Sequence, residues 1–217
     1  MKKLFTIIFL AILMQANSQS FYKGALVIDA GAGLEIFNTK VSITEKSTGK
    51  TETSVDKAGN SHFILGGEYG ILKNLGVGIR YKNNSYFTEK DSVTGTKGTI
   101  KSNDILLLVN YHLISKKSFD FIVGADFGYS GINYHFNDSQ NTQLKGSGLY
   151  YSFYMNPRLY IGRFGFNMKL GLPFVNYPKL KTNDSDFNKS YSAFNLKATP
   201  GFGLSFGIQF RFLDVKE

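Results

Sequence analysis

Serine, histidine and acidic side chains are the groups in this sequence that could do chemistry. Two of its three histidines, His62 and His135, fall near the ends of alternating apolar and polar segments. Ser130, Asp126 and Ser152 are expected at a similar depth. A serine nucleophile needs a hydrogen-bonded histidine base and an acid that orients the base, and such a set cleaves esters. Three histidines among so many serines produce such neighbours by chance, so we predict no catalytic residues and a non-enzymatic protein.

Metal and nucleotide sites have no better support. His62 and His135 lack a third ligand at a recognisable metal-site spacing. The segment 49–51, Gly-Lys-Thr, matches the end of a phosphate-binding loop. However, Thr44 stands where the first glycine of that loop belongs, and no strand-to-helix context surrounds it. The chain has no cysteine, which excludes thiolate and disulfide chemistry. We predict no metal and no cofactor.

The segments that must position these side chains are ones in which apolar and polar residues alternate along the chain. In 201–212, every even position is Phe, Leu or Ile, and every odd position is Gly, Ser, Gln or Arg. A strand directs alternate side chains to opposite faces, so this segment is a strand with one apolar and one polar face. Seven other segments alternate in this way, at about 24–37, 61–71, 75–82, 100–113, 119–130, 149–161 and 164–174.

Connections between these strands alternate in length. Long polar loops are expected at 38–60, 83–99, 133–146 and 175–197, and short turns at 72–75, 115–117 and 162–163. Gly162 suits a two-residue type II′ hairpin. Long loops on one side, tight turns on the other and an even strand number are typical of outer-membrane barrels. The predicted fold is therefore all-β, an eight-stranded antiparallel up-and-down transmembrane β-barrel, with 19–217 as its domain.

The polar face decides which side of the barrel meets lipid. A soluble, lipocalin-like barrel would put its apolar face inward and would need scattered polarity outside. Here the charges are sparse, lie between glycines and are nearly absent from the apolar face, which favours a lumen. We predict a lumen charge network of Asp29, Glu35, Glu68, Arg80, Asp104, His112, Asp120, Asp126, Arg158, Lys169 and Arg211.

Buried charges should pair, because an unpaired buried charge is costly. The turn positions predict four cross-strand lumen pairs: Glu68–Arg80, His112–Asp120, Arg158–Asn167 and Asn156–Lys169. Pro157 lacks a ladder donor, so we expect a bulge there. Aromatic residues near the strand ends predict two interfacial girdles. The loop-side girdle is Phe37, Phe63, Tyr81 and Tyr129, and the turn-side girdle is Tyr69, Tyr111, Phe119, Phe164 and Phe210.

The start of the chain is typical of a secretory signal peptide. Lys2 and Lys3 precede an apolar run, 4–14, that is too short to span a membrane as a helix. Small residues at 16–18 predict cleavage before Gln19, so we assign 1–18 to the signal peptide. The formal net charge is +9, with loop lysines at 46, 50, 57, 90, 97, 179, 181 and 189. This balance favours anionic lipid over nucleic acid as a partner.

The strand pattern and the closing strand resemble the small outer-membrane β-barrel domain family, the OmpA/OmpX-type eight-stranded barrels and their PorT-like relatives. The resemblance covers 19–212, and 205–212 (SFGIQFRF) matches the family's terminal insertion signal of polar, x, Gly, x, x, apolar, x, aromatic. It implies that the barrel insertion machinery is a partner, with Ser205, Gly207, Phe210 and Phe212 as the signal residues. The chain departs from the pattern by continuing to Glu217.

Together these features predict a multi-pass protein of the bacterial outer membrane in a Gram-negative cell envelope. We expect four long surface loops to contact lipopolysaccharide, a ligand or a protein, around a lumen too full for a general pore. One alternative, implied by the PorT-like relatives, is an accessory barrel with a secretion protein partner. Another is a lipid A-modifying hydrolase. Co-purification with secretion components would support the former, and turnover of labelled lipopolysaccharide the latter.

Overall fold

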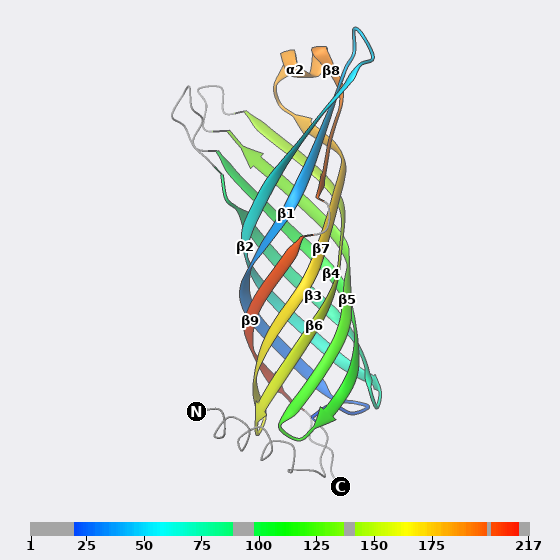
Figure 1. The fold of residues 1–217 in the computed structure, drawn as a ribbon, viewed down its shortest axis with the longest axis vertical. Helices are drawn as coiled ribbons and strands as arrows, with labels where there is room; N and C mark the ends of the chain where they lie inside the picture. Colours follow the sequence, from blue (N-terminus) through cyan, green and yellow to red (C-terminus); the bar gives the residue numbers. More distant parts are fainter. Residues whose placement is uncertain (1–19, 89–97, 137–141, 199–200, 213–217) are drawn as a thin grey trace.

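The chain folds into a tall β-barrel (Figure 1). The computed structural model describes residues 20–88, 98–136, 142–198 and 201–212. The predicted signal peptide, 1–18, and the tail after Phe212 lie outside the described residues. The elements in chain order are β1 (Leu26–Glu45), β2 (Thr51–Leu72), β3 (Leu75–Tyr86), β4 (Thr99–Lys116), β5 (Phe119–His135), β6 (Gln143–Ile161), β7 (Phe164–Thr182), α2 (Ser185–Ser190), β8 (Tyr191–Ala198) and β9 (Phe202–Arg211).

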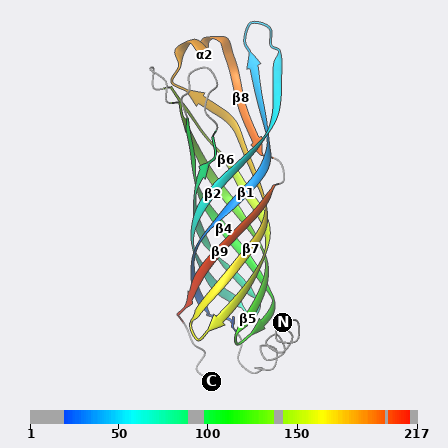
Figure 2. The ribbon, with the colours of Figure 1, turned by 60° about the vertical axis from the view of Figure 1, so that its left-hand side comes forward.

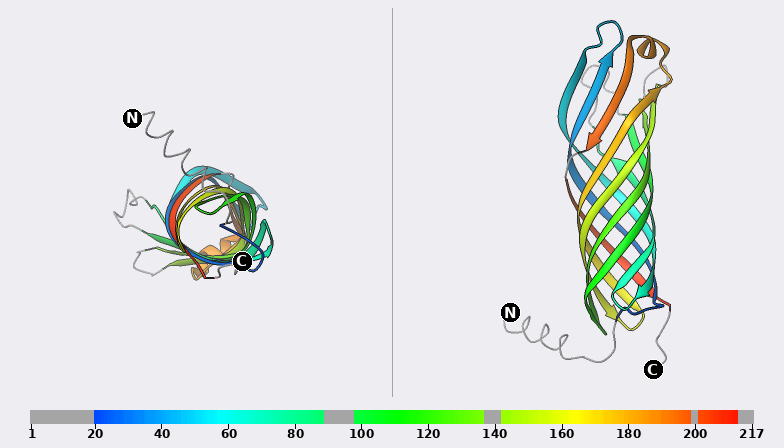
Figure 3. Two further views of the ribbon diagram at one scale, coloured as in Figure 1. Left: turned by 90° about the horizontal axis from the view of Figure 1, so that it is seen from below. Right: turned by 90° about the vertical axis from the view of Figure 1, so that its right-hand side faces the viewer.

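The strands close into a single ring. Consecutive strands pair antiparallel from β1 to β7, and the gap between β7 and β1 is filled by β8 and β9. β9 pairs with both neighbours over one half of their length, and β8 pairs with both over the other half. These two strands therefore share one place in the ring. Figure 3 shows the closed ring end-on. The nine labelled strands make an eight-stranded antiparallel barrel, as predicted.

Two-residue turns join the strands at one end of the barrel, which we call the turn end. Leu72 pairs with Leu75, and Lys116 pairs with Phe119. The third turn is the predicted hairpin at 162–163, where Gly162 has a φ of 64°. Glycine adopts this left-handed conformation without steric strain, whereas other residues seldom do. The predicted two-residue hairpin is confirmed.

The four predicted long loops are too long, because the strands continue through most of 38–60 and 175–197, through half of 133–146 and through the ends of 83–99. β1 and β2, for example, are separated only by 46–50. Their outer parts are rich in Thr, Ser and Val, which pair well across strands. The hydroxyls of Ser42 and Thr53 lie 3.1 Å apart, and those of Thr44 and Thr51 lie 2.9 Å apart. The strands therefore extend beyond their predicted ends. At this end of the barrel, which we call the loop end, they are joined by 46–50, 87–98, 136–142 and 183–190 (Figure 2).

The short helix α2 lies at the loop end between β7 and β8. The Asp184 carboxylate caps it by accepting hydrogen bonds from two backbone N–H groups of the first turn, at 2.9 and 3.2 Å. Lys46 donates to the backbone carbonyl of Asn188 at 2.5 Å, which ties the β1–β2 hairpin to this helix. Among the described residues, no helix has the length and apolar character needed to cross a membrane.

Two local predictions are wrong. Pro157 forms no bulge, since the register is the same on either side of it, with Phe121 opposite Pro157. The ladder from β6 to β7 instead lacks pairs at 156 and 157, and a proline has no N–H to donate there. Phe37 does not join the loop-side girdle, because its side chain points into the barrel and is 7% exposed. Its neighbour Ile36 takes the outward position and is 63% exposed.

Candidate functional site: a charged lumen below an apolar outer chamber

The predicted lumen charges lie inside the barrel. Ten of the eleven residues are at most 9% exposed, and the side chain of the eleventh, Lys169, is 12% exposed. The structure adds Lys82, which is 3% exposed. The sequence carried a signal for it, because Lys82 is two residues from Arg80 on the same strand and so shares its face. The part of the barrel interior that holds these charges is therefore a packed polar core.

Glu68 is the centre of the charge cluster nearest the turn end. Its carboxylate lies 2.8 Å from Arg158 Nη2 and 2.9 Å from His112 Nε2. The other ring nitrogen of His112 lies 2.8 Å from the Asp120 carboxylate. All four side chains are 3% exposed or less. The cluster joins β2, β4, β5 and β6 across the lumen.

The predicted lumen pairs are only partly correct. Glu68 is not opposite Arg80, because a register shift at 70–72 places Glu68 against Gly78. His112 and Asp120 are in contact as predicted, although Asp120 pairs in the ladder with another residue of β4. The Arg158–Asn167 pair is confirmed. Lys169, expected across from Asn156, bonds to Asp126.

Arg80 is the centre of a second cluster. Its Nη1 donates to both oxygens of the Asp126 carboxylate, at 2.6 and 2.7 Å, and its Nη2 lies 3.9 Å from Asp29. Lys169 also donates to Asp126, and its ammonium lies 3.8 Å from the centroid of the Tyr154 ring. Three strands that are not all neighbours thus meet at one carboxylate.

A third cluster lies nearer the loop end. Lys82 donates to the Glu35 carboxylate at 2.6 Å and to the Tyr150 hydroxyl at 3.2 Å. Asp104, the ladder partner of Lys82 on the neighbouring strand β4, accepts a hydrogen bond of 2.5 Å from the Ser130 hydroxyl. These contacts give the buried carboxylates the partners that burial requires.

The chain before β1 closes the turn end of the lumen. Ser20 and Phe21 are fully buried, and the Phe21 ring stacks on His112 with 3.5 Å between ring centroids. The Phe21 N–H donates to Ser115 Oγ at 2.9 Å. Arg211, from β9, donates to the backbone carbonyl of Ser20 at 2.7 Å. This segment covers the charge clusters at the turn end. The alternation of apolar and polar residues in the strands did not predict its position.

The serine, histidine and acidic side chains considered as a catalytic set are not brought together. In the described part of the chain, Ser130 and Asp126 bond to other lumen residues and not to a histidine. One serine–histidine contact does exist, with His62 Nε2 at 2.8 Å from Ser205 Oγ. The space beside this pair is about 20 Å³, which is room for one water molecule. No group of three metal-ligating side chains occurs among the described residues.

The inner face of the barrel changes from polar to apolar toward the loop end. On β1, the next inward residue after Glu35 is Phe37, and on β5 the next after Ser130 is Ile132. The inward apolar residues form one cluster: Phe37, Leu106, Ile132, Leu144, Tyr150, Val175, Tyr177, Leu180 and Ala198. Beyond this change the barrel is apolar inside and polar outside, which is the arrangement of a water-soluble β-protein.

This apolar interior is not filled. It contains a cavity of about 240 Å³, which we call the outer chamber. Its walls include Phe37, Tyr86, Ile132, Leu144, Val175 and Phe194. The exposed residues Asp56 and Lys57 of β2 also line it, so the chamber reaches solvent beside that strand.

No protein-family model matches the chain, and no curated protein does. Among solved structures, the outer membrane protein OprG from Pseudomonas aeruginosa aligns with a TM-score of 0.61. The alignment covers 89% of this chain and 98% of OprG, at 14% sequence identity. The chain has the fold of the small eight-stranded outer-membrane β-barrels. Neisserial surface protein A and Ail of Yersinia pestis align at 12% identity, with TM-scores of 0.45 and 0.44 over 88% of this chain and 100% and 99% of theirs.

The exterior of the barrel has the apolar band that lipid requires. Large apolar side chains such as Ile79, Ile105 and Phe206 are each about 60% exposed on the outer face, where they would meet hydrocarbon. The insertion-signal residues lie on or next to β9, with Ser205 pointing inward to His62. Their role as a signal stays a prediction.

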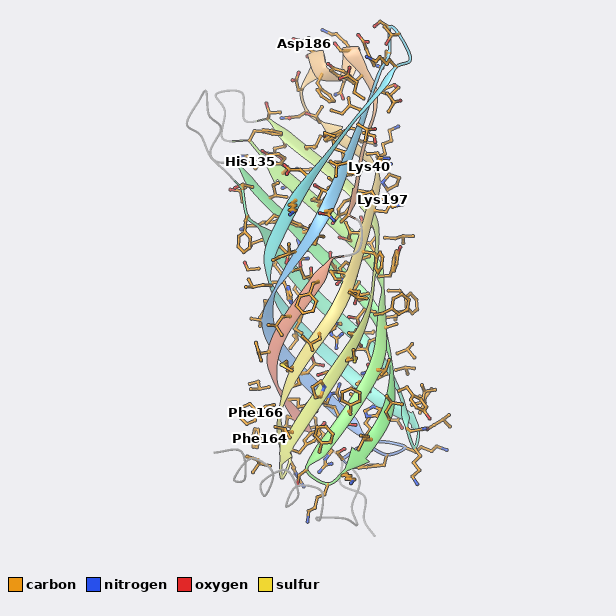
Figure 4. The ribbon with its side chains drawn as sticks, in the orientation of Figure 1. Lys40, His135, Phe164, Phe166, Asp186 and Lys197 are labelled. Atoms are coloured by element: carbon orange, nitrogen blue, oxygen red, sulfur yellow. The ribbon has the colours of Figure 1, made fainter. Side chains whose placement is uncertain are left out.

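Exposed lysines on β1, β4 and β6 lie beyond this apolar band, each four residues along its strand from the last outward apolar residue. On β1, the last outward apolar residue is Ile36, and Lys40 follows four residues later. The same spacing joins Ile105 to Lys101 on β4. It recurs on β6, from Leu149 to Lys145, which pairs directly with Lys181 of β7. Figure 4 shows Lys40 beside Lys197 toward the loop end, with Phe164 and Phe166 at the turn end.

Proposed function

We propose that this barrel is a non-enzymatic surface protein that binds the phosphate groups of anionic outer-leaflet lipid, lipopolysaccharide above all. The binding groups are Lys40, Lys101, Lys145 and Lys181, which we call the lysine group. The observation that carries the proposal is the repeated four-residue spacing between each of the first three lysines and the last outward apolar residue of its strand. All four lysines are exposed, and none takes part in an ion pair within the described residues.

The spacing puts the ammonium groups at the depth of lipid phosphates. Four strand residues span roughly 13 Å, or about 10 Å along the membrane normal at the tilt of a barrel strand. A lysine side chain can bend back toward the interface along its apolar stem. Lys145 and Lys181 are direct cross-strand partners, an arrangement in which two like charges repel unless an anion lies between them.

The interior supports binding rather than hydrolysis. Ser205 and His62 have the contact that a nucleophile and a base need, but both are buried in the lumen. A space of about 20 Å³ beside them cannot admit a lipid ester. The hydroxyl and the imidazole instead satisfy each other as buried polar groups.

The packed lumen leads to a prediction about conductance. Three charge clusters and the segment 20–24 occupy the barrel from the turn end upward. We expect the refolded protein to give no steady current in a planar lipid bilayer. The control is a variant lacking 20–24, which should stay closed because the clusters remain. A large, stable conductance of the intact protein would contradict the closed lumen.

Removing the lysine group should weaken lipid A binding. A lysine near an anionic surface contributes on the order of 1 kcal/mol, so replacing all four by glutamine should weaken binding at least roughly tenfold. We would titrate lipid A into the barrel in neutral detergent and follow the rise in Tm. The rise should be large for the natural chain, smaller at high salt and nearly absent for the variant.

A charge-matched variant provides the control. Glutamine at Lys46, Lys50, Lys57 and Lys189 removes the same charge from exposed loop-end positions without the four-residue spacing. This variant should keep the lipid A response, and dephosphorylated lipid A should give none with any chain. Equal Tm shifts for the two variants would show that net charge, and not the lysine group, attracts the lipid.

A further inference from the structure

The outer chamber lies toward the loop end, where the inner face of the barrel is apolar and the outer face is polar, as in a soluble β-barrel. Below it, charged and polar side chains leave only small voids in the lumen, of about 10 and 20 Å³, and Lys82 and Glu35 form the nearest cluster. Around it, all of the strands from β1 to β8 contribute aromatic or aliphatic side chains. A tightly packed interior leaves few voids larger than a water molecule. A cavity of about 240 Å³ is far larger than that.

The wall of the chamber offers few polar partners. The Tyr177 hydroxyl is 2.7 Å from Ser130 Oγ, and the Tyr86 hydroxyl is 3.3 Å from Ser102 Oγ. Both hydroxyls are therefore engaged with lumen serines. Water fills a cavity only where it finds two to four polar partners, and apolar cavities stay dry. Because water that enters the chamber from solvent finds few such partners, an apolar occupant can displace it at little cost.

We infer that the outer chamber is a binding site for a compact apolar molecule of about two fused rings. A dry protein cavity of about 150 Å³ accommodates benzene, so a volume of about 240 Å³ suits the next ring size. Aromatic walls such as Phe37, Tyr86 and Phe194 favour a planar ring over a flexible chain, because ring pairs gain from stacked or edge contacts. The opening beside Asp56 and Lys57 gives such a molecule a route from solvent.

This site is independent of the lysine group. The lysines act on the outer face of the barrel, whereas the chamber is formed by the opposite, inward face of the same strands. Loss of lipid A binding would leave the chamber unchanged, so the two proposals can fail separately.

The absence of tryptophan from the chain makes a direct test available. Phe194→Trp places the single tryptophan of the described barrel in the chamber wall, and Phe206→Trp places it on the outer face, where Phe206 is 59% exposed. Each variant, folded in phospholipid nanodiscs, is titrated with 2-bromonaphthalene, whose bromine quenches indole fluorescence on contact. We expect saturable quenching of the chamber reporter, on the order of micromolar. The outer reporter should show only a linear decrease from partitioning into lipid.

A filled chamber provides the second variant. Ala58→Leu in the Phe194→Trp background adds bulk at a lining position and should weaken the saturable quenching at least roughly tenfold. Retained heat-modified mobility on gels checks that this variant is folded. A linear response at both reporters, or saturable quenching that Ala58→Leu leaves unchanged, would overturn the inference. Saturation by 1-bromooctane at lower concentration than by 2-bromonaphthalene would overturn the ring class.

Discussion

The Glu68→Lys variant is expected to lose the folded barrel. Glu68 is 1% exposed and is the carboxylate that both Arg158 and His112 approach within 2.9 Å. A lysine there would put a second permanent cation beside Arg158 and leave Asp120 as the only acid of the cluster. Breaking a buried ion pair costs about 3–5 kcal/mol, and reversing the charge costs more. Folded proteins are stable by only about 5–15 kcal/mol, so most of that margin would be lost.

The same strand provides a matched control. Glu52, also on β2, has a side chain that is 79% exposed and pairs with Lys50 at 3.4 Å. Glu52→Lys makes the same change of charge in a solvated pair, which contributes about 0–1 kcal/mol. Urea titrations of both variants in lipid vesicles, read by the heat-modified gel shift, give the free energies of unfolding. Equal stabilities would show that the lumen network does not hold the barrel together.

The alternation of side chains was enough to predict the barrel. On 201–212 the even positions are apolar and the odd ones polar, and the structure places Phe206 outside and Ser205 inside. This works because the membrane imposes one sign of alternation on every strand that crosses it. The short turns followed from the same pattern, since glycine at 162 marks the hairpin.

The outer halves of the strands could not be predicted in this way. Beyond Ile36 and Glu35, the polar residues of β1 turn outward and the apolar ones inward. Apolar and polar residues still alternate, but the apolar ones now point inward. A search for apolar residues on the lipid-facing positions therefore ends near Ile36. Serine, threonine and lysine in 38–60 then suggest a loop, although Thr44 and Thr51 pair across the hairpin.

The partners of the lumen charges also needed the structure. Hairpin register predicts contacts only between strands that follow each other in the chain. The strongest contacts cross the lumen instead, as between Arg80 of β3 and Asp126 of β5, or Glu68 of β2 and Arg158 of β6. Which strands meet across the lumen depends on the stagger of the whole ring, a property of the closed barrel.

The two proposed binding sites are linked by the change in direction of the apolar side chains, which point outward in the lipid-facing half of the strands and inward beyond it. Lipid contact requires apolar residues outside, and the proposed lipid-phosphate site uses lysines that lie just beyond them, such as Lys101. Solvent beyond that level requires apolar residues inside, which creates the walls of the outer chamber around Phe37. Both sites therefore follow from one change in the environment of the same strands.

The Phe212→Ala variant should fold normally in vitro and assemble poorly in cells. Phe212 follows β9, and its ring is half exposed and contacts Phe210 with 4.8 Å between centroids. Its backbone N–H donates to Leu26 at 3.0 Å, a bond that alanine keeps. Refolding into lipid vesicles should therefore match the natural chain. Recognition of an edge strand depends on side-chain pockets as well as backbone pairing, so we expect the amount in the outer membrane to fall roughly tenfold.

Phe202→Ala is the matched control, because Phe202 begins β9 on the same outward face and is 55% exposed. The two variants lose similar apolar contact with lipid, but Phe212 is the last residue of the predicted insertion signal, 205–212, whereas Phe202 precedes that signal. If the machinery reads Phe212, the Phe202 variant reaches the outer membrane normally while the Phe212 variant accumulates in the periplasm. Equal assembly of the two would assign Phe212 a role in lipid contact alone, and β9 would then serve only to close the barrel between β1 and β7.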